Sequence, residues 1–128
     1  MADGYLQIGQ VAERTELSIK TIRHYDEIGL VTPSARSNGG FRLYTDEDVD
    51  RLLVVRRMKP LGFTLEQMRQ LLDALDTLAD DSAPAERRHA ARTDFDDIRA
   101  QARERGIALR RQLTYAEEFV ELLAARGQ

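Results

Sequence analysis

The sequence of 128 residues has no cysteine, no tryptophan and three prolines. Without cysteine the chain forms no disulfide, no thiolate metal site and no thiol redox sensor. It has no run of about 18 apolar residues, so we expect no membrane-spanning segment. Its first residues also lack the basic and then apolar pattern of a secretory signal. These absences predict a soluble cytoplasmic protein.

Motifs for catalysis are missing as well. We find no glycine-rich phosphate loop and no nucleophile motif. His24 and His89 are far apart and have no neighbouring cysteine, so we expect no metal site. Asp96 and Asp97 are consecutive and diverge by about 100° around a helix, which suits a solvated face better than an acid–base pair. The sequence therefore predicts no enzyme and no cofactor.

Charge is distributed unevenly along the chain. The net charge of -3 is unusual for a nucleic-acid binder, because many of these proteins are strongly basic. Between residues 20 and 44, however, four basic residues outnumber two acidic ones, and most acids gather at residues 46–48, 80–81 and 94–97. A local basic surface is sufficient for phosphate contacts.

The first part of the chain predicts two short helices and a hairpin. Residues 7–14 place apolar side chains on one helical face, and residues 18–27 follow after a short break. Ser18 is a favourable N-cap and Gly29 a stop signal for the second helix. The Ser-Asn-Gly-Gly sequence at residues 37–40 predicts a turn between two short strands. This order is typical of a winged helix-turn-helix.

Helix signals continue after the hairpin. Thr45 predicts the start of a helix with three acidic residues in its first turn, where they suit the helix dipole. Pro60 should kink or end that helix. Thr64 and Gln67 then predict a capping box for a fourth helix. We expect this DNA-binding part to cover residues 5–75.

The rest of the chain predicts a linker and one long helix. Residues 76–85 have the composition of a linker, and residues 86–126 would form a helix of ~60 Å. A helix of this length cannot bury its own apolar stripe, so it calls for a partner helix and predicts a homodimer. The stripe consists of Phe95, Ile98, Ala102, Leu109, Ala116, Phe119 and Leu123.

Arginine and aromatic side chains concentrate between residues 18 and 44, and such groups suit phosphates and base edges. At about 100° per residue, Arg23 turns away from Ile22 on the buried side of its helix. The sequence leaves two interpretations of Arg23 open, a DNA contact or a surface ion pair with Asp26 or Glu27.

Five blocks of the chain resemble, in order and spacing, the MerR family of bacterial transcription regulators. The resemblance covers about residues 5 to 75. The blocks are Ile-Gly-Gln-Val-Ala at 8–12, Thr-Ile-Arg-His-Tyr-Asp at 21–26, Ile-Gly-Leu at 28–30, Gly-Phe-Arg-Leu-Tyr at 40–44 and Leu-Gly-Phe-Thr-Leu at 61–65.

This resemblance implies a mainly α fold: a winged helix-turn-helix with a small two-stranded wing, two further helices, and a long C-terminal dimerisation helix that forms an antiparallel coiled coil. It implies that Arg23 contacts DNA from the recognition helix and that Arg42 and Tyr44 clamp the DNA backbone. Tyr44 also fits a core aromatic, and for Tyr25 we expect a packed ring with its hydroxyl near a phosphate. The residues expected at the DNA are Ser18, Lys20, Thr21, Arg23, His24, Tyr25, Arg36, Asn38, Arg42 and Tyr44.

The function that the resemblance implies is regulation of transcription by a homodimer on a near-palindromic promoter operator, with distortion of the double-stranded DNA. RNA polymerase and a small-molecule effector stay open as further partners, and we expect no membrane contact. The sequence does not identify an effector, an operator or target genes, nor does it separate activation from repression.

One alternative is an architectural or excisionase-like DNA-bending protein, which would not need the long helix. Another is a protein-binding adaptor, which would not need Arg23 and Arg42.

The chain departs from the family pattern at three positions. Glu16 stands where the family usually has glycine, so a left-handed turn residue would be strained there. His24 replaces an aromatic residue, and Phe41 stands where tyrosine is common. None of these changes removes an arginine that we expect to bind DNA.

Overall fold

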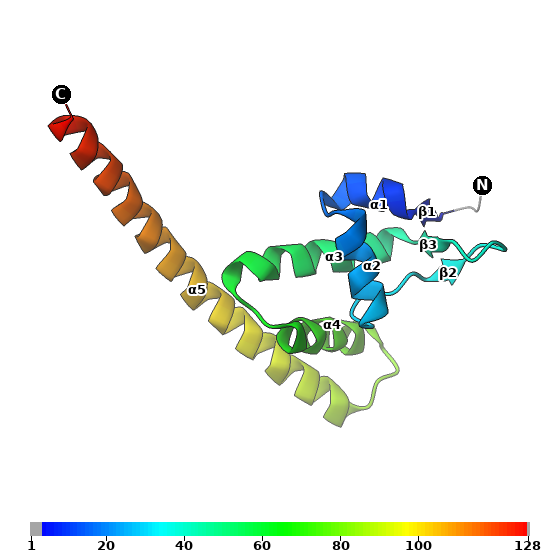
Figure 1. Ribbon diagram of the computed structural model, residues 1–128. Helices are drawn as coiled ribbons and strands as arrows, with labels where there is room; N and C mark the ends of the chain where they lie inside the picture. Colours follow the sequence, from blue (N-terminus) through cyan, green and yellow to red (C-terminus); the bar gives the residue numbers. More distant parts are fainter. Residues whose placement is uncertain (1–3, 128) are drawn as a thin grey trace. The chain divides into compact units, whose positions relative to one another are not determined.

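The computed structural model describes residues 4–127, in two compact units that divide between Asp73 and Ala74 (Figure 1). Among residues 4–127 we find no helix with the length and hydropathy of a membrane span. The elements, in chain order, are β1 (Leu6–Gln7), α1 (Ile8–Thr15), α2 (Ile19–Glu27), β2 (Ala35–Arg36), β3 (Arg42–Tyr44), α3 (Asp46–Met58), the 3-10 helix η1 (Lys59–Leu61), α4 (Leu65–Ala79) and α5 (Ala85–Arg126).

The turn between α1 and α2 is strained at Glu16. This residue follows α1 with φ 58° and ψ 24°, the left-handed conformation, and its N–H donates to the Ala12 carbonyl at 2.9 Å. The left-handed turn residue that the sequence analysis considered at Glu16 is therefore present. A side chain in this conformation costs roughly 1–2 kcal/mol. The Glu16 carboxylate lies 3.6 Å from Arg56, but this pair is well exposed and contributes little.

Both ends of α2 match the sequence prediction. The Ser18 hydroxyl accepts a hydrogen bond from the Thr21 N–H at 3.0 Å, which confirms Ser18 as the N-cap. At the other end Leu30 N–H donates to Tyr25 O at 2.9 Å and Gly29 N–H to Asp26 O at 3.0 Å. This is a Schellman motif, and Gly29 has the φ of +71° that it requires.

The wing is a three-stranded antiparallel sheet in the order β1-β3-β2. The predicted hairpin is confirmed as β2 and β3, joined by a tight turn in which Gly40 has φ +82°. Gly40 N–H donates to Ser37 O at 2.9 Å within this turn. Strand β1 adds to the other edge of β3, with Leu6 opposite Tyr44. The sequence did not predict this third strand, because two residues carry no periodic pattern.

Two reciprocal capping boxes start the helices that follow. At α3, Thr45 accepts from Asp48 N–H and Asp48 accepts from Thr45 N–H, which confirms Thr45 as the start of the helix and adds a capping box that was not predicted. The buried Asp48 carboxylate also accepts from the hydroxyl of Ser34 at 2.6 Å, so it ties the loop after α2 to α3. At α4, Thr64 and Gln67 form the second box.

A continuous apolar core holds these elements of the first unit together. Each of its side chains is nearly inaccessible, and burial of one such side chain contributes about 1.5–3 kcal/mol relative to exposure. The core contains Tyr44, whose hydroxyl is buried and has no hydrogen-bond partner among residues 4–127. The fully buried side chains are Val11, Thr15, Ile22, Val31, Tyr44, Val49, Leu52, Val55 and Leu72.

The second unit contains the end of α4, a short turn and α5. Helix α4 continues to Ala79, so the segment between the helices, residues 80–84, is shorter than the linker predicted at 76–85. Asp80 holds this turn, because its carboxylate accepts from the Ser82 hydroxyl at 2.6 Å and its carbonyl accepts from Arg88 at 2.7 Å. These hydrogen bonds give the segment a defined conformation.

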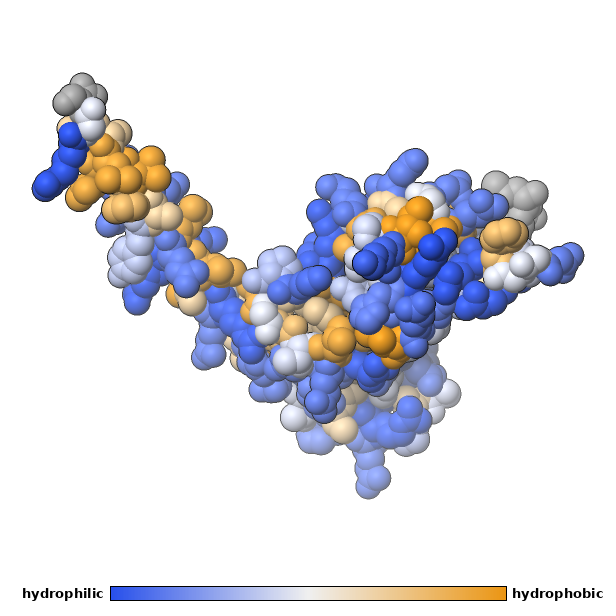
Figure 2. All heavy atoms as spheres, viewed as in Figure 1, coloured by the Kyte–Doolittle hydropathy of each residue, from blue (hydrophilic) through white to orange (hydrophobic). Residues whose placement is uncertain are grey.

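Helix α5 is 42 residues long, which confirms the predicted long C-terminal helix. Ala91 and Ile98 are its buried residues, and every residue from Gly106 to Gly127 is exposed. Figure 2 shows apolar surface along this exposed end of the helix. The large apolar side chains there are Ile107, Leu109, Leu113, Tyr115, Phe119, Val120, Leu122 and Leu123.

Replacement of Glu16 by glycine should stabilise the protein. We expect Glu16→Gly to raise the free energy of unfolding by about 1 kcal/mol, because glycine adopts the left-handed conformation without a Cβ clash. Glu16→Ala is the control, since it removes the same carboxylate and keeps the strain. Urea denaturation of both variants measures the effect, and equal stability of the two would show that the turn is not strained.

Replacement of Tyr44 by phenylalanine tests the buried hydroxyl. A buried polar group without a partner costs about 1–3 kcal/mol, so its removal should leave the free energy of unfolding unchanged or raise it by about 1 kcal/mol. Tyr25→Phe serves as a comparison at a second packed tyrosine. Thermal melting with calorimetry measures the stability of both variants. A clear loss of stability in Tyr44→Phe would show that the Tyr44 hydroxyl has a hydrogen-bond partner.

Candidate nucleic-acid interface

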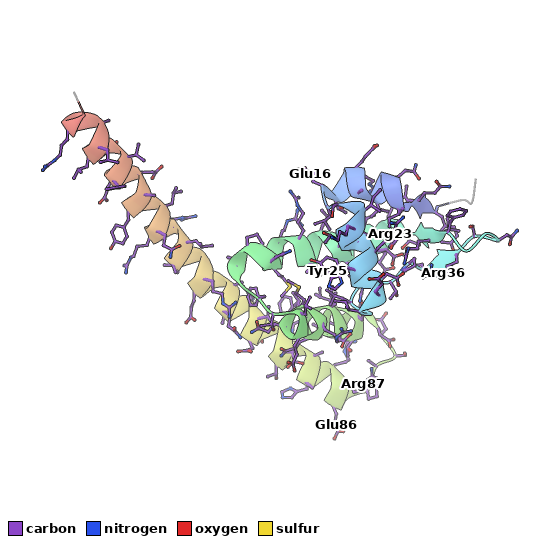
Figure 3. All side chains as sticks on the ribbon, viewed as in Figure 1. Glu16, Arg23, Tyr25, Arg36, Glu86 and Arg87 are labelled. Atoms are coloured by element: carbon purple, nitrogen blue, oxygen red, sulfur yellow. The ribbon has the colours of Figure 1, made fainter. Side chains whose placement is uncertain are left out.

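Helix α2 has one buried side and one exposed side. Ile22 and Tyr25 are buried in the core, as the sequence predicted for Ile22, and Lys20, Arg23 and His24 are exposed. Figure 3 shows Arg23 and Tyr25 on this helix. The rotation of α2 therefore presents cationic and hydrogen-bonding side chains to solvent.

Arg23 has no hydrogen-bond or ion-pair partner among residues 4–127. The sequence had left open an ion pair with Asp26 or Glu27, and the structure does not contain it. The carboxylate of Asp26 instead binds two arginines of the wing. All five N–H donors of the Arg23 guanidinium therefore stay available to a ligand.

Arg36 and Arg42 converge on Asp26. The Asp26 Oδ2 atom accepts from Arg42 Nε at 2.6 Å and from Arg36 Nη2 at 2.9 Å. The hydrogen bond to Asp26 raises the pKa of Arg42 above its ordinary value. The wing is thereby tied to the last turn of α2, and no sequence pattern indicated this pairing.

The wing loop is exposed and carries Asn38, an expected contact. Beside it the side chain of Phe41 is 70% exposed. Its ring lies so close to Gly39 that a Cβ there would come within 3.1 Å of the ring. Glycine at this position therefore lets the phenyl ring cover the loop. The sequence analysis predicts no DNA contact for Phe41.

Two of the expected contact residues have buried rings. Tyr44 is 0% exposed, and burial, followed by the nearby Asp26, raises the pKa of its hydroxyl. A DNA phosphate cannot reach it in this conformation, so the expected backbone contact is corrected to the core role that the sequence had left open. Tyr25 is 4% exposed, and burial raises its pKa too.

Ser18 and Thr21 bind one another at the start of α2. The Ser18 hydroxyl donates to the Thr21 hydroxyl at 2.8 Å and accepts from the Thr21 N–H. Both side chains are therefore engaged in capping. They lie at the positive end of the helix dipole, next to the exposed Lys20, where an anion is favoured.

Arg69 of α4 is a residue that sequence reasoning missed. Its guanidinium donates to the carbonyls of Gly29 at 2.9 Å and Ile28 at 3.1 Å, at the end of α2. A cation is favourable there, because the carbonyl end of a helix carries a partial negative charge. No local pattern could have indicated it, since Arg69 and Gly29 are 40 residues apart.

The arrangement is suited to an extended polyanion. One exposed helix face and the adjacent wing present cations and amide donors, and the described residues 4–127 hold no group of three metal-ligating side chains. Phosphate contacts by such groups position a protein on a duplex, and contacts to base edges provide specificity. The side chains available for these contacts are Lys20, Arg23, His24, Arg36, Asn38 and Arg42.

Comparison with known proteins gives the same interpretation. The chain matches the model of the MerR HTH family regulatory protein at residues 6–75 and that of the MerR DNA-binding domain at residues 49–115. It is 44% identical to the transcriptional activator TipA of Streptomyces coelicolor over 82 residues. These residues are 64% of this chain and 32% of TipA. The chain thus spans about a third of the length of this relative.

Two further proteins match over more of their length. The transcriptional regulator CueR of Vibrio cholerae is 38% identical over 109 residues, 85% of this chain and 69% of CueR. The crystal structure of HiNmlR, a MerR family regulator lacking the sensor domain, was determined bound to promoter DNA. It superposes with a TM-score of 0.61 and 25% identity, over 97% of this chain and 96% of HiNmlR. With these matches, the chain belongs to the MerR family of winged helix-turn-helix regulatory proteins.

Proposed function

We propose that this protein is a sequence-specific DNA-binding transcription regulator that acts as a homodimer on a near-palindromic promoter operator. The observation that carries the proposal is the unpaired guanidinium of Arg23 on the exposed face of α2, beside a wing that carries Arg36 and Arg42. The resemblance to HiNmlR, whose structure contains promoter DNA, supports it.

In this proposal α2 enters the major groove of one operator half-site and the wing contacts the flanking backbone. Arg23 can pair bidentately with a guanine or grip an adjacent phosphate. One dimer bound to two half-sites would bend and untwist the promoter, so that RNA polymerase engages both promoter elements. Such a regulator acts in the cytoplasm, where the bacterial chromosome lies.

The exposed end of α5 supports the homodimer. A solitary helix that exposes a row of large apolar side chains would be insoluble or partnered. A second copy of α5 would cover this row of side chains, as paired helices do in a coiled coil.

Charge along α5 favours antiparallel pairing. Between residues 99 and 111 five arginines accompany one glutamate, and between residues 112 and 125 the three charged residues are all glutamates. An antiparallel pair brings the basic stretch of each helix beside the acidic stretch of its partner. A parallel pair would place like charges side by side, which is unfavourable at interhelical flanks.

Nuclease footprinting on the region upstream of the gene tests the proposed function. One protected region with two-fold symmetry supports an operator-specific regulator. Scattered weak protection would favour an architectural DNA-bending protein, and no protection would favour a protein-binding adaptor. The second and third results would both overturn the proposal.

Substitution of Arg23 should separate binding from stability. We expect Arg23→Ala to weaken operator binding by about 1–3 kcal/mol and to leave the melting temperature nearly unchanged, because the side chain is exposed and unpaired. Arg23→Lys should restore binding in part, since a point charge does not reproduce the planar fork. Gel-shift titration and thermal melting measure both effects. If the folded Arg23→Ala variant bound the operator with wild-type affinity, this result would contradict the assignment of α2 as the recognition helix.

Charged residues in the apolar surface of α5 should dissociate the dimer. Leu113 is 58% exposed, so Leu113→Glu disturbs no packing within the chain and should still yield a folded monomer. Operator binding should fall sharply, because two half-sites are no longer joined. Sedimentation velocity measures the change.

Thr114→Glu is the matched control, since it adds the same charge about 100° around the helix from Leu113. It should remain a dimer. If Leu113→Glu stayed dimeric at micromolar concentration, the interface would lie elsewhere in the molecule.

A further inference from the structure

One carboxylate serves both arginines of the wing. Asp26 Oδ2 accepts hydrogen bonds from Arg42 Nε at 2.6 Å and from Arg36 Nη2 at 2.9 Å. The Asp26 side chain is 10% exposed, and that of Arg42 is 23% exposed. Partial burial weakens solvent screening, so the Arg42–Asp26 pair is stronger than a pair at the open surface, whereas the Arg36 side chain is 49% exposed and its pair contributes less.

The strand register explains why a carboxylate is needed there. Arg36 and Arg42 are direct partners across β2 and β3. Two like charges opposite one another in an antiparallel pair repel and destabilise the hairpin. Asp26 offsets this repulsion, and the cluster of three side chains keeps one net positive charge.

Asp26 occupies an unfavourable position for its own helix. It lies in the last turn of α2, where the helix dipole disfavours a negative charge. A residue that is unfavourable for its own helix but binds residues distant in the sequence indicates a functional constraint. The distant contact here links the recognition helix to the wing.

The hydrogen bonds leave part of the arginine donors free. Arg42 uses Nε for Asp26, and neither of its Nη atoms has a partner among the described residues. Arg36 uses Nη2 for Asp26 and Nη1 for the carbonyl of Gly40 at 3.4 Å. The Arg42 Nη atoms can therefore still reach a phosphate while Asp26 holds the guanidinium in place.

We infer that Asp26 is a positioning residue that sets the ratio of specific to non-specific DNA binding, an inference that rests on the proposed function. It fixes the wing arginines relative to α2, so that their phosphate contacts form best when α2 is seated in the major groove. It also removes one positive charge from the cluster, which limits attraction to any duplex. Its loss frees a cation for phosphates and uncouples the wing from the recognition helix.

The test is Asp26→Asn, which keeps the shape and removes the charge. Fluorescence anisotropy measures its affinity for a random-sequence 30-bp duplex and for the operator found with the wild-type protein. Binding to the random duplex should tighten about fivefold to tenfold at 0.1 M salt, with one further unit in the slope of log affinity against log salt. Operator affinity should not improve, so the ratio of the two affinities should fall about as much.

Glu27→Gln is the matched control. Glu27 is the neighbouring exposed acid, and it makes no hydrogen bond to either wing arginine among the described residues. It changes the charge by the same amount, so it should tighten both affinities similarly and preserve their ratio. A parallel change in Asp26→Asn, upward or downward, would overturn the inference, because it would reduce Asp26 to bulk charge or to a structural role.

Asp26→Glu gives a second test that does not depend on the folding of the asparagine variant. It keeps the charge and shifts both guanidinium groups, so random-duplex affinity should stay near wild type while operator affinity falls. Wild-type operator affinity in this variant would contradict a positioning role. If the wild-type protein did not distinguish the operator from the random duplex, the proposed function itself would fail, and this outcome is separate from the others.

Discussion

The burial of Ile22 and Tyr25 fixes the rotation of α2, and the rest of the candidate interface depends on this rotation. With these two side chains in the core, the helix turns Lys20, Arg23 and His24 toward solvent. A different rotation would expose apolar side chains and lose their burial energy, about 1.5–3 kcal/mol for each. The exposed face is therefore held by the core and needs no support from a ligand.

Both ends of α2 are held by side chains from outside the helix. The Ser18 hydroxyl caps the first turn, and Arg69 binds the carbonyls that follow the last turn. The Schellman motif at Gly29 then directs the chain toward the wing. Because Arg36 and Arg42 of the wing form ion pairs with Asp26 of α2, the helix and the hairpin form one connected surface. In the proposed function, this connection couples base contacts by α2 to phosphate contacts by the wing.

The second unit exposes most of its long helix. Helix α5 buries Ala91 and Ile98 and exposes every residue from Gly106 onward. Its apolar surface and its segregated charge would both be satisfied by a second, antiparallel copy. The described residues contain no cysteine and no cluster of metal ligands.

Local features of this protein were determined by the sequence alone. The caps at Ser18, Thr45 and Thr64, the stop at Gly29 and the hairpin turn at residues 37–40 all depend on residues within five positions of each other, so their patterns are visible in the sequence. The exposed face of α2 followed from helical periodicity for the same reason.

Tertiary structure alone decided the pairings between distant residues: β1 with β3, the two wing arginines with Asp26, Arg69 with the end of α2, and the burial of Tyr44. An arginine in a strand has the same local pattern whether it faces solvent or a carboxylate. Which of these it meets depends on how the elements pack, and packing depends on the whole chain.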